Sequence, residues 1–313
     1  MKLKHLLLIP LLLLTSCNSN VDTSSLKIVC PTGAPAICFY KESENSNFET
    51  NSTPSNIVSM MNSNSDKDIV VIDTVSGIMA INNGAPYKIC ANITLGNFFI
   101  ASTGLDEDNI MNEGDTIILF GQNQTPDYLF HYLFDDKFND SIEYVTNVQD
   151  ASKCLASGKN LITKSNVDYV FIAQPALYTI LNNKEALTYG KSSIYMDVQE
   201  EYKKKSNGLS IIQASIFVKE ASDRKVVNSY LKELKKNIEL AINNPEVIAE
   251  PISKIGEELA LSLYGVNLNV AKNVLSDNNK LGLGYISAKE NKQAIDNFVN
   301  LFGVEDTHEE IYY

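Results

Sequence analysis

The sequence predicts an α/β protein with two lobes, each built around its own sheet and joined to the other by a hinge. The first observation is a short apolar run, residues 26–30, that breaks at Pro31 and Gly33 and continues into a helix-like segment. The second is a later copy of this pattern, in which the strand-like run 116–120 is followed by Gly121 and another helix-like segment. Two strand–turn–helix passages in separate halves of a chain place helix N-termini where they can face one another.

Length and composition indicate a globular protein with more than one domain. The chain has 313 residues, of which 44% are hydrophobic and 20% are charged. Its formal net charge is −12. Binding to nucleic acid needs a basic surface that neutralises phosphates, so we expect no nucleic-acid partner. We expect a monomer.

The N-terminus has the pattern of an export signal. Lys2 and Lys4 precede an apolar core, residues 6–14, that is too short to span a bilayer. The sequence Leu-Thr-Ser-Cys that ends at Cys17 resembles a bacterial lipobox, in which this cysteine is diacylated and becomes the mature N-terminus. An ordinary cleavage site with an incidental cysteine is the alternative.

We therefore predict a lipoprotein signal peptide over residues 1–17 and a flexible tether over the polar residues 18–25. The product would be extracytoplasmic and held at the cell membrane by lipid on Cys17. Because Lys2 and Lys4 are removed, the formal charge would change from −12 to −14.

The first half of the chain alternates strands and helices. The apolar run 69–72, flanked by acids, is typical of a buried parallel strand, and a helix follows that ends near Gly84. Two further strand-like runs, 87–94 and 97–103, are separated by Leu95 and Gly96. We predict that the chain crosses to the second lobe near residues 102–104.

A new series of strands and helices begins at Thr116. We predict a helix over 125–135, a strand over 142–146, a helix over 148–157 and a third strand over 167–173. We expect the return to the first lobe near residues 209–212, followed by a helix-rich tail that leans on the first lobe. These limits give a first lobe of residues 26–103 plus 210–313 and a second lobe of residues 104–209.

Four cysteines remain after Cys17, and no two have C-x-x-C spacing. Zinc or redox chemistry is therefore poorly supported, and we expect no metal and no cofactor. An even number in an exported protein permits disulfides. Most of the four lie in apolar runs, so we favour buried thiols over one disulfide. The cysteines are Cys30, Cys38, Cys90 and Cys154.

Ligand-binding candidates are the polar residues just beyond the predicted strand ends. Their hydroxyl, amide and backbone groups can hold a small polar molecule, although the same residue types also serve as ordinary helix caps. Asp73 has both roles open: it either points into the cleft, where it would favour an amine or a heterocyclic N–H, or caps the next helix. The candidates are Thr32, Gly33, Asp73, Thr74, Ser76, Thr94 and Asn97 in the first half, and Gln122, Gln124, Thr125 and Gln174 in the second.

Catalytic signatures are missing from the sequence. Only His131 and His308 lie beyond the signal peptide, and neither has a nucleophile motif beside it. G-x-S-x-G and H-E-x-x-H are both absent. We therefore expect that the protein has no catalytic residues and is not an enzyme. Catalysis by two carboxylates stays an alternative, because no spacing in the sequence singles out a pair.

Four short segments carry a family resemblance. They are Pro-Thr-Gly-Ala-Pro-Ala at 31–36, the Asp73-Thr74 turn, Gly96-Asn97, and Gly-Gln-x-x-Thr-Pro-Asp at 121–127. With these segments the chain resembles the type II solute-binding lipoproteins of ABC importers, in the branch that binds sulfonates, nitrate and thiamine precursors. The resemblance implies a periplasmic-binding-protein type II fold with a helical C-terminal pack. It also implies a small-molecule solute and an ABC permease in the membrane as partners.

Two departures from that branch bear on the solute. The chain has no tryptophan, and its one arginine, Arg224, lies in a charged helical pattern away from the predicted cleft. A neutral or zwitterionic heterocycle such as a thiamine-pyrimidine precursor therefore leads, and a sulfonate, nitrate or another small oxyanion comes second. An enzyme on the same scaffold, with pyrimidine-forming or chorismate-dehydrating chemistry, is one alternative, and a surface sensor or adhesin lipoprotein is another.

Overall fold

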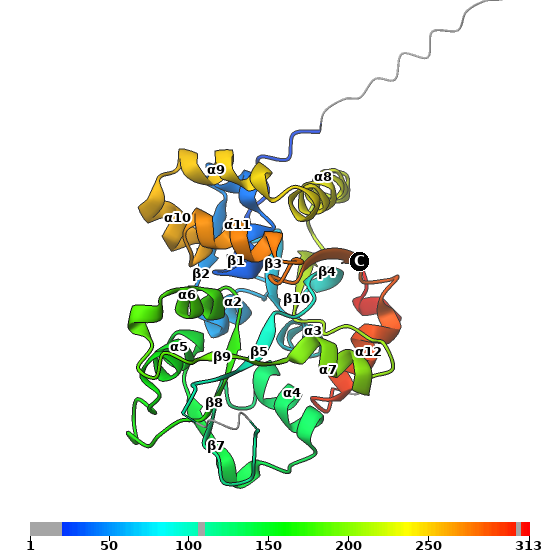
Figure 1. Ribbon diagram of the computed structural model, residues 1–313. Helices are drawn as coiled ribbons and strands as arrows, with labels where there is room; N and C mark the ends of the chain where they lie inside the picture. Colours follow the sequence, from blue (N-terminus) through cyan, green and yellow to red (C-terminus); the bar gives the residue numbers. More distant parts are fainter. Residues whose placement is uncertain (1–20, 106–109, 305–307) are drawn as a thin grey trace, which may run out of the picture.

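The computed structural model of the protein describes residues 21–105, 110–304 and 308–313. These residues form two separate sheets, one in each lobe (Figure 1). The two-lobed α/β architecture is confirmed. The predicted signal peptide and its Cys17 lie outside the described residues.

The first sheet has six strands in the order β11-β4-β10-β3-β1-β2. β1 pairs in parallel with β2 and β3, whereas β10 runs antiparallel to β3 and β4, and β11 runs antiparallel to β4. Ala214 pairs with both Asp73 and Thr94, so the carboxyl ends of β3 and β4 meet beside the start of β10. The strands are β1 (Ile28–Pro31), β2 (Phe48–Asn51), β3 (Ile69–Asp73), β4 (Tyr87–Thr94), β10 (Ala214–Lys219) and β11 (Leu283–Ser287).

The second sheet has five strands in the order β7-β6-β8-β5-β9. β6 pairs in parallel with β7 and β8, and β5 runs antiparallel to β8 and β9. The strands are β5 (Phe98–Ser102), β6 (Ile117–Phe120), β7 (Ile142–Val145), β8 (Tyr169–Ala173) and β9 (Ser193–Asp197).

The crossing between the lobes corrects the predicted boundary. β5, residues 98–102, belongs to the second sheet, so the chain crosses at residues 95–97 and not near 102–104. The predicted first-lobe limit of 103 is therefore wrong. Gly96 has a φ of 92°, and a Cβ there would lie 2.9 Å from the side chain of Gln199. The break at Leu95-Gly96 is thus the crossing itself and not a kink within the first lobe.

Helices cover both sheets. Their bounds are α1 (Ala34–Ile37), α2 (Pro54–Ser59), α3 (Thr74–Asn82), α4 (Thr125–Phe134), α5 (Val148–Ser157), α6 (Ala176–Asn182), α7 (Val198–Lys205), α8 (Arg224–Asn243), α9 (Ala249–Lys254), α10 (Glu257–Tyr264), α11 (Leu268–Ser276) and α12 (Lys292–Asn300). Short 3-10 turns lie at η1 (Tyr40–Glu42), η2 (Asn139–Ser141), η3 (Lys184–Ala186), η4 (Pro245–Ile248) and η5 (Glu309–Ile311).

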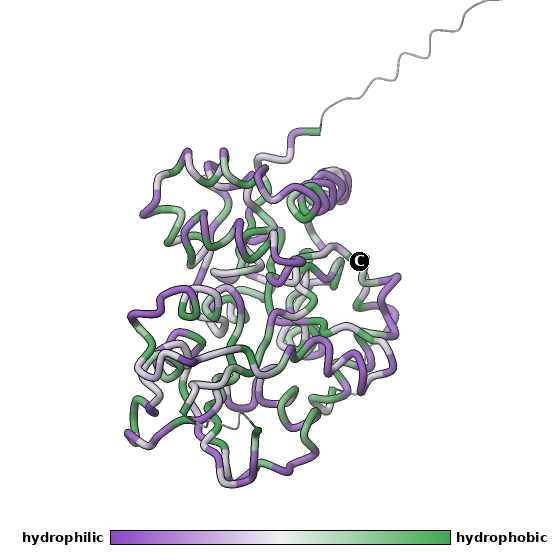
Figure 2. Tube along the Cα trace, viewed as in Figure 1, coloured by the Kyte–Doolittle hydropathy of each residue, from purple (hydrophilic) through white to green (hydrophobic). Residues whose placement is uncertain are grey.

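The longest helix, α8, forms because its apolar residues recur three and four apart while the others are mostly hydrophilic (Figure 2). The carboxylate of Asp223 caps its start by accepting from the backbone N–H groups of Lys225 and Val226. No helix in the described ranges is long and apolar enough to cross a bilayer.

The C-terminal helices divide between the lobes. Residues of α8 to α11 share a buried cluster with one face of the first sheet, as expected. Helix α12 and the turn after it also contact the second lobe. Between ring centroids, Phe298 of α12 lies 6.1 Å from Tyr202 of α7, and Phe302, just after α12, lies 4.5 Å from Tyr128 of α4. The prediction that the whole tail leans on the first lobe is therefore wrong for α12 (Figure 1).

Candidate functional site

Asp73 and Thr125 join the two lobes directly. Thr125, the first residue of α4, donates its hydroxyl to Asp73 Oδ2 at 2.6 Å. The other oxygen, Oδ1, accepts from the backbone N–H and the hydroxyl of Ser76 at 3.0 and 3.2 Å. Asp73 thus caps α3, which is one of the two roles that the sequence suggests, and it also reaches the second lobe. Burial raises the pKa of Asp73, while its hydrogen bonds with Thr125 and Ser76 oppose that rise.

The neighbouring Thr74 is used inside the first lobe. Its side chain is buried, and its Oγ1 lies 2.6 Å from Ser215 Oγ. Asn92 donates its amide to the same Ser215 oxygen at 2.8 Å, and Asn291 donates to Asn92 Oδ1 at 2.8 Å. These bonds fix α3 to the first sheet and occupy the Thr74 hydroxyl within the lobe.

Asn97 of the crossing bonds to another predicted residue, Gln174, which follows β8. Asn97 donates its side-chain amide to the Gln174 carbonyl at 2.7 Å, and the Gln174 N–H donates to the Asn97 carbonyl at 2.8 Å. Gln174 Oε1 accepts from the backbone N–H of Tyr178 at 3.0 Å, near the start of α6. The end of β8 and the start of α6 are therefore fastened to the crossing.

Three buried oxygens near this crossing have no hydrogen-bond partner among the residues that the structure describes. They are Thr94 Oγ1, Asn97 Oδ1 and Gln213 Oε1. Thr94 is fully buried and Asn97 is 2% exposed. The Gln213 N–H donates to the Thr94 carbonyl at 3.0 Å, and the Gln213 carbonyl accepts from the Thr74 N–H at 3.1 Å. Sequence reasoning missed Gln213, because nothing in its local pattern shows that β10 begins beside Thr94.

Thr32 and Gly33 form the turn between β1 and α1. Gly33 has a φ of 114°, which suits glycine, and α1 has no side-chain cap. A Cβ placed on Gly265 would lie 3.0 Å from Thr32 Cγ2, so the turn between α10 and α11 covers Thr32. Among the remaining predicted residues, Gln122 and Gln124 are exposed on the turn before α4.

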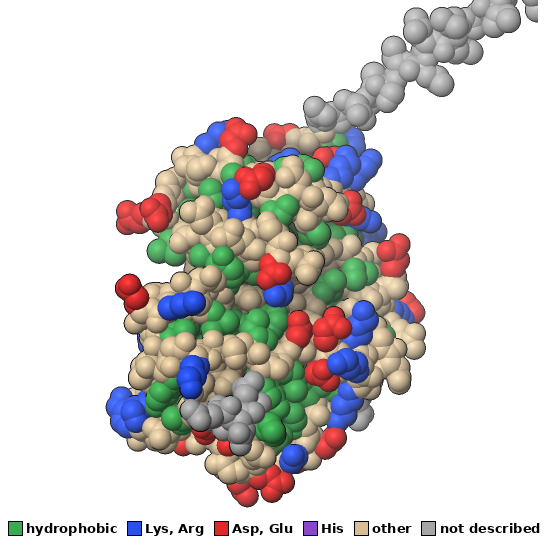
Figure 3. Space-filling view, in the orientation of Figure 1, with side chains coloured by type: hydrophobic (Ala, Val, Ile, Leu, Met, Phe, Trp, Pro, Cys, Tyr) green, Lys and Arg blue, Asp and Glu red, His purple; other side chains and the backbone are tan. Residues whose placement is uncertain are grey.

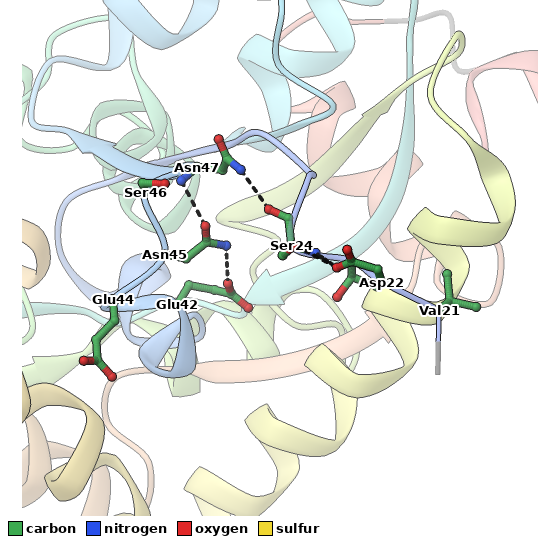
Figure 4. A pocket seen from close by; sticks show the side chains of 9 residues that line it. Val21, Asp22, Ser24, Glu42, Glu44, Asn45, Ser46 and Asn47 are labelled. Carbon is green, nitrogen blue, oxygen red and sulfur yellow. Dashed lines mark hydrogen bonds between the residues drawn. The ribbon is translucent and has the colours of Figure 1, made fainter. Parts of the chain in front are cut away.

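Two surface cavities lie away from all of these residues. One of about 640 Å³ lies beside the first residues described, where Asn45 donates to Glu42 and Asn47 donates to the Ser24 carbonyl (Figure 4). The second, of about 350 Å³, is lined by Leu133, Phe134, Met196, Glu201, Lys204 and Lys205. Asp73 and Thr125 meet between the lobes, and on the face drawn in Figure 3 the surface is hollowed between the lobes.

The described histidine and cysteine side chains are not arranged for metal binding or nucleophilic chemistry. Within residues 21–105, 110–304 and 308–313, no cluster of three His, Cys, Asp or Glu side chains could hold a metal ion. His131 lies between two carboxylates, with Nε2 3.2 Å from Asp127 Oδ1 and Nδ1 3.1 Å from Asp136 Oδ1. The four described cysteines are free thiols, and burial raises the pKa of Cys30, which disfavours its reactive thiolate form.

Comparison with known proteins gives the fold. No protein-family model matches the chain, and no curated protein matches its sequence. A solved structure of an ABC transporter protein from Parabacteroides distasonis aligns over 90% of this chain and 92% of its own, with a TM-score of 0.63 and 17% identity. The periplasmic aliphatic sulphonate binding protein SsuA from Escherichia coli aligns over 89% and 87%, with a TM-score of 0.57 and 12% identity.

The chain has the periplasmic-binding-protein fold. The Candida albicans CA3427 gene product, described as having the generic form of that fold, aligns over 91% of each chain with a TM-score of 0.50 and 13% identity. The fold implied by the resemblance is therefore confirmed. At these identities the likeness concerns the fold, and the solute has to be argued from this chain's own residues.

Proposed function

We propose that this protein is a lipid-anchored receptor that captures one small polar solute between its lobes and delivers it to an ABC permease. The observation that carries the proposal is the meeting of Asp73 and Thr125, which brings the starts of α3 and α4 together between two sheets. Ligands of open α/β sheets bind outside the carboxyl ends of the strands, which is where these residues lie. The lobes would open and close about the two crossings, which are residues 95–97 and the return segment, residues 206–213, between α7 and β10.

The membrane attachment in this proposal rests on the sequence. The lipobox-like segment ending at Cys17 supports a diacylated N-terminus outside the cytoplasm, with residues 18–25 as the tether. The absence of G-x-S-x-G and H-E-x-x-H from the sequence and the engagement of His131 by two aspartates support a receptor that does not transform its solute.

The proposed contacts with the solute come from both lobes and from the crossing. A neutral or zwitterionic heterocycle leads as the solute, with a small sulfonate or another oxyanion second. The Escherichia coli protein with a similar fold is a sulphonate binding protein, which supports sulfonates as the second solute class. The proposed contacts are Asp73, Ser76, Thr94, Asn97, Thr125 and Gln174, with Thr32 and Gly33 at the rim and Gln122 and Gln124 on the exposed turn before α4.

Thermal unfolding across a panel of small solutes tests this proposal. A solute that binds only the folded protein raises the melting temperature as its concentration exceeds the dissociation constant. We expect one solute class to do so, and we expect Asn97→Ala to reduce the shift while Asn243→Ala, on the exposed face of α8, leaves it unchanged. Conversion of the solute by the purified protein would contradict the receptor proposal.

A further inference from the structure

We infer that the interlobe site selects a solute that presents hydrogen-bond donors, either an amine or amidine cation or a heterocycle with N–H groups, and that it rejects oxyanions. This inference rests on the proposed function and narrows it to one chemical class. It places Asp73 as the group that the solute's donor contacts.

The helix starts that would hold an anion already carry carboxylates. The Asp73 carboxylate sits at the start of α3, bound to the N–H of Ser76. In the first turn of α4, Asp127 is 6% exposed and accepts from the backbone N–H of Asn123 at 2.8 Å and from the Tyr144 hydroxyl at 2.6 Å. Because the positive end of each helix is compensated within the chain, an added oxyanion would meet two negative groups instead.

Within the described chain, no lysine or arginine is bonded to either of these carboxylates. Asp73 accepts hydrogen bonds from Thr125, from Ser76 and from the backbone. Asp127 faces His131 at 3.2 Å, and that histidine is shared with Asp136. No arginine is available for bidentate recognition of an anion, since Arg224 lies against the ring of Tyr313.

The unpartnered oxygens near the crossing are a second indication, independent of Asp73, that the solute presents hydrogen-bond donors. Asn97 Oδ1 and Gln213 Oε1 are amide oxygens, which only accept hydrogen bonds, and Thr94 Oγ1 is a hydroxyl oxygen that can also accept. Buried acceptors without a donor are unfavourable, so nearly all such atoms in native proteins find a partner. A solute with several N–H groups would supply donors where the chain supplies none.

The register of the first sheet brings these oxygens to the same end of the strands as the Asp73 carboxylate. Ala214 pairs with both Asp73 and Thr94, and Gln213 precedes it and bonds to the backbones of Thr94 and Thr74. Asn97 follows Thr94 by three residues, on the crossing itself. The carboxylate and the three acceptors therefore line one end of the sheet, beside the second lobe.

Thr125 shows how the carboxylate receives a donor from outside its own lobe. Its hydroxyl meets Asp73 Oδ2 at 2.6 Å, a short distance that is typical of an O–H donating to a charged acceptor. A solute N–H can take this place while Ser76 keeps the other oxygen. Entry of the solute would then exchange a contact between lobes for one that runs through the solute.

Binding assays on the purified full-length protein in detergent test the inference with four probes. Acetamidine and 4-aminopyrimidine present donors, whereas methanesulfonate and nitrate are oxyanions. We expect both donor probes to raise the melting temperature and both anions to leave it unchanged. Asp73→Asn should weaken acetamidine at least tenfold, and Asp223→Asn, which changes a cap with no contact to the other lobe, should not.

A second variant keeps the test decisive if Asp73→Asn does not fold. Thr94→Val removes an unpartnered acceptor and breaks no hydrogen bond within the described residues, so this variant should fold like the wild type and bind the donor probes more weakly. Stabilisation by methanesulfonate or nitrate, or undiminished donor binding in Thr94→Val, would overturn the inference and leave the receptor proposal standing. If all four probes fail but the wider solute panel yields a ligand, the inference again fails by itself. If the wider panel also fails, the receptor proposal fails with it.

Discussion

Two of the contacts between the lobes differ in character, and both involve α4. At the first residue of α4, the Thr125 hydroxyl meets the Asp73 carboxylate at 2.6 Å. One turn later, the ring of Tyr128 lies 4.5 Å from that of Phe302, while Phe298 of α12 packs near Tyr202. A polar contact can be exchanged for a solute that offers the same hydrogen bond, whereas separating the rings exposes apolar surface. We therefore expect the lobes to part at Asp73 and to stay joined beside α12.

The largest effect is expected at the aromatic contact. Phe298 is fully buried, so Phe298→Ala should lower the free energy of unfolding by about 3–5 kcal/mol. Denaturant unfolding of the purified protein measures this change. Leu240→Ala, at an exposed leucine of α8, serves as the control and should change stability by less than about 0.5 kcal/mol. Equal effects for the two variants would contradict a stabilising role for α12.

The polar contact should be weaker but still measurable. Asp73→Ala removes the cap of α3 and leaves the buried Thr125 hydroxyl without its acceptor, which together should cost about 2 kcal/mol. Asp223→Ala removes only a cap and should cost about 1 kcal/mol. If both variants lose the same stability in denaturant unfolding, the contact between the lobes contributes nothing.

Removing the hydroxyl alone isolates a single hydrogen bond. Thr125→Val keeps the shape of the side chain and should cost about 1 kcal/mol. The exposed Thr53, whose side chain makes no cap bond to α2, provides the matched Thr53→Val control. A cost above that of Asp73→Ala would mean that Thr125 acts through packing and not through the carboxylate.

The smallest expected effect concerns pH. Because burial raises the pKa of Asp73 above its usual 3.8, the folded state binds this proton more tightly than the unfolded state. The resulting stabilisation is fully present below pH 3.8 and is lost as pH rises through the folded-state pKa. Relative to the wild type, Asp73→Asn should therefore gain stability as pH rises from 3.8 to 7. Denaturant unfolding at each pH measures this change. The same measurement on Asp223→Asn serves as the control for pH effects that do not come from Asp73.

The local patterns predicted most strands, but not the sheet that each strand joins. The run 69–72 is apolar and flanked by acids, and it forms the buried part of β3. β4 and β5 are both apolar, but they join different sheets on either side of Gly96. The reason is that β5 pairs with β8 and β9, which lie far along the chain. Such pairing depends on distant residues, so the segment itself does not reveal the crossing.

The candidate site, too, could be predicted only in part, because some of its residues depend on distant strand pairing. A carboxylate that ends a strand before a helix is recognisable, and one oxygen of Asp73 caps α3 while the other accepts from Thr125 of the second lobe. Gln213 has no such pattern and gains its significance only from lying beside Thr94. Gln122 and Gln124 follow a strand end equally well, yet the turn leaves both exposed.

The state of the cysteines has a practical consequence. Cys30, Cys38 and Cys154 are buried and Cys90 is half-buried, and desolvation raises the pKa of Cys90 to about 12. None of these thiols competes well for a maleimide at neutral pH. A single cysteine introduced on the surface of each lobe would be the preferred site of attachment, so a pair of dyes could follow the separation of the lobes without first removing any native residue.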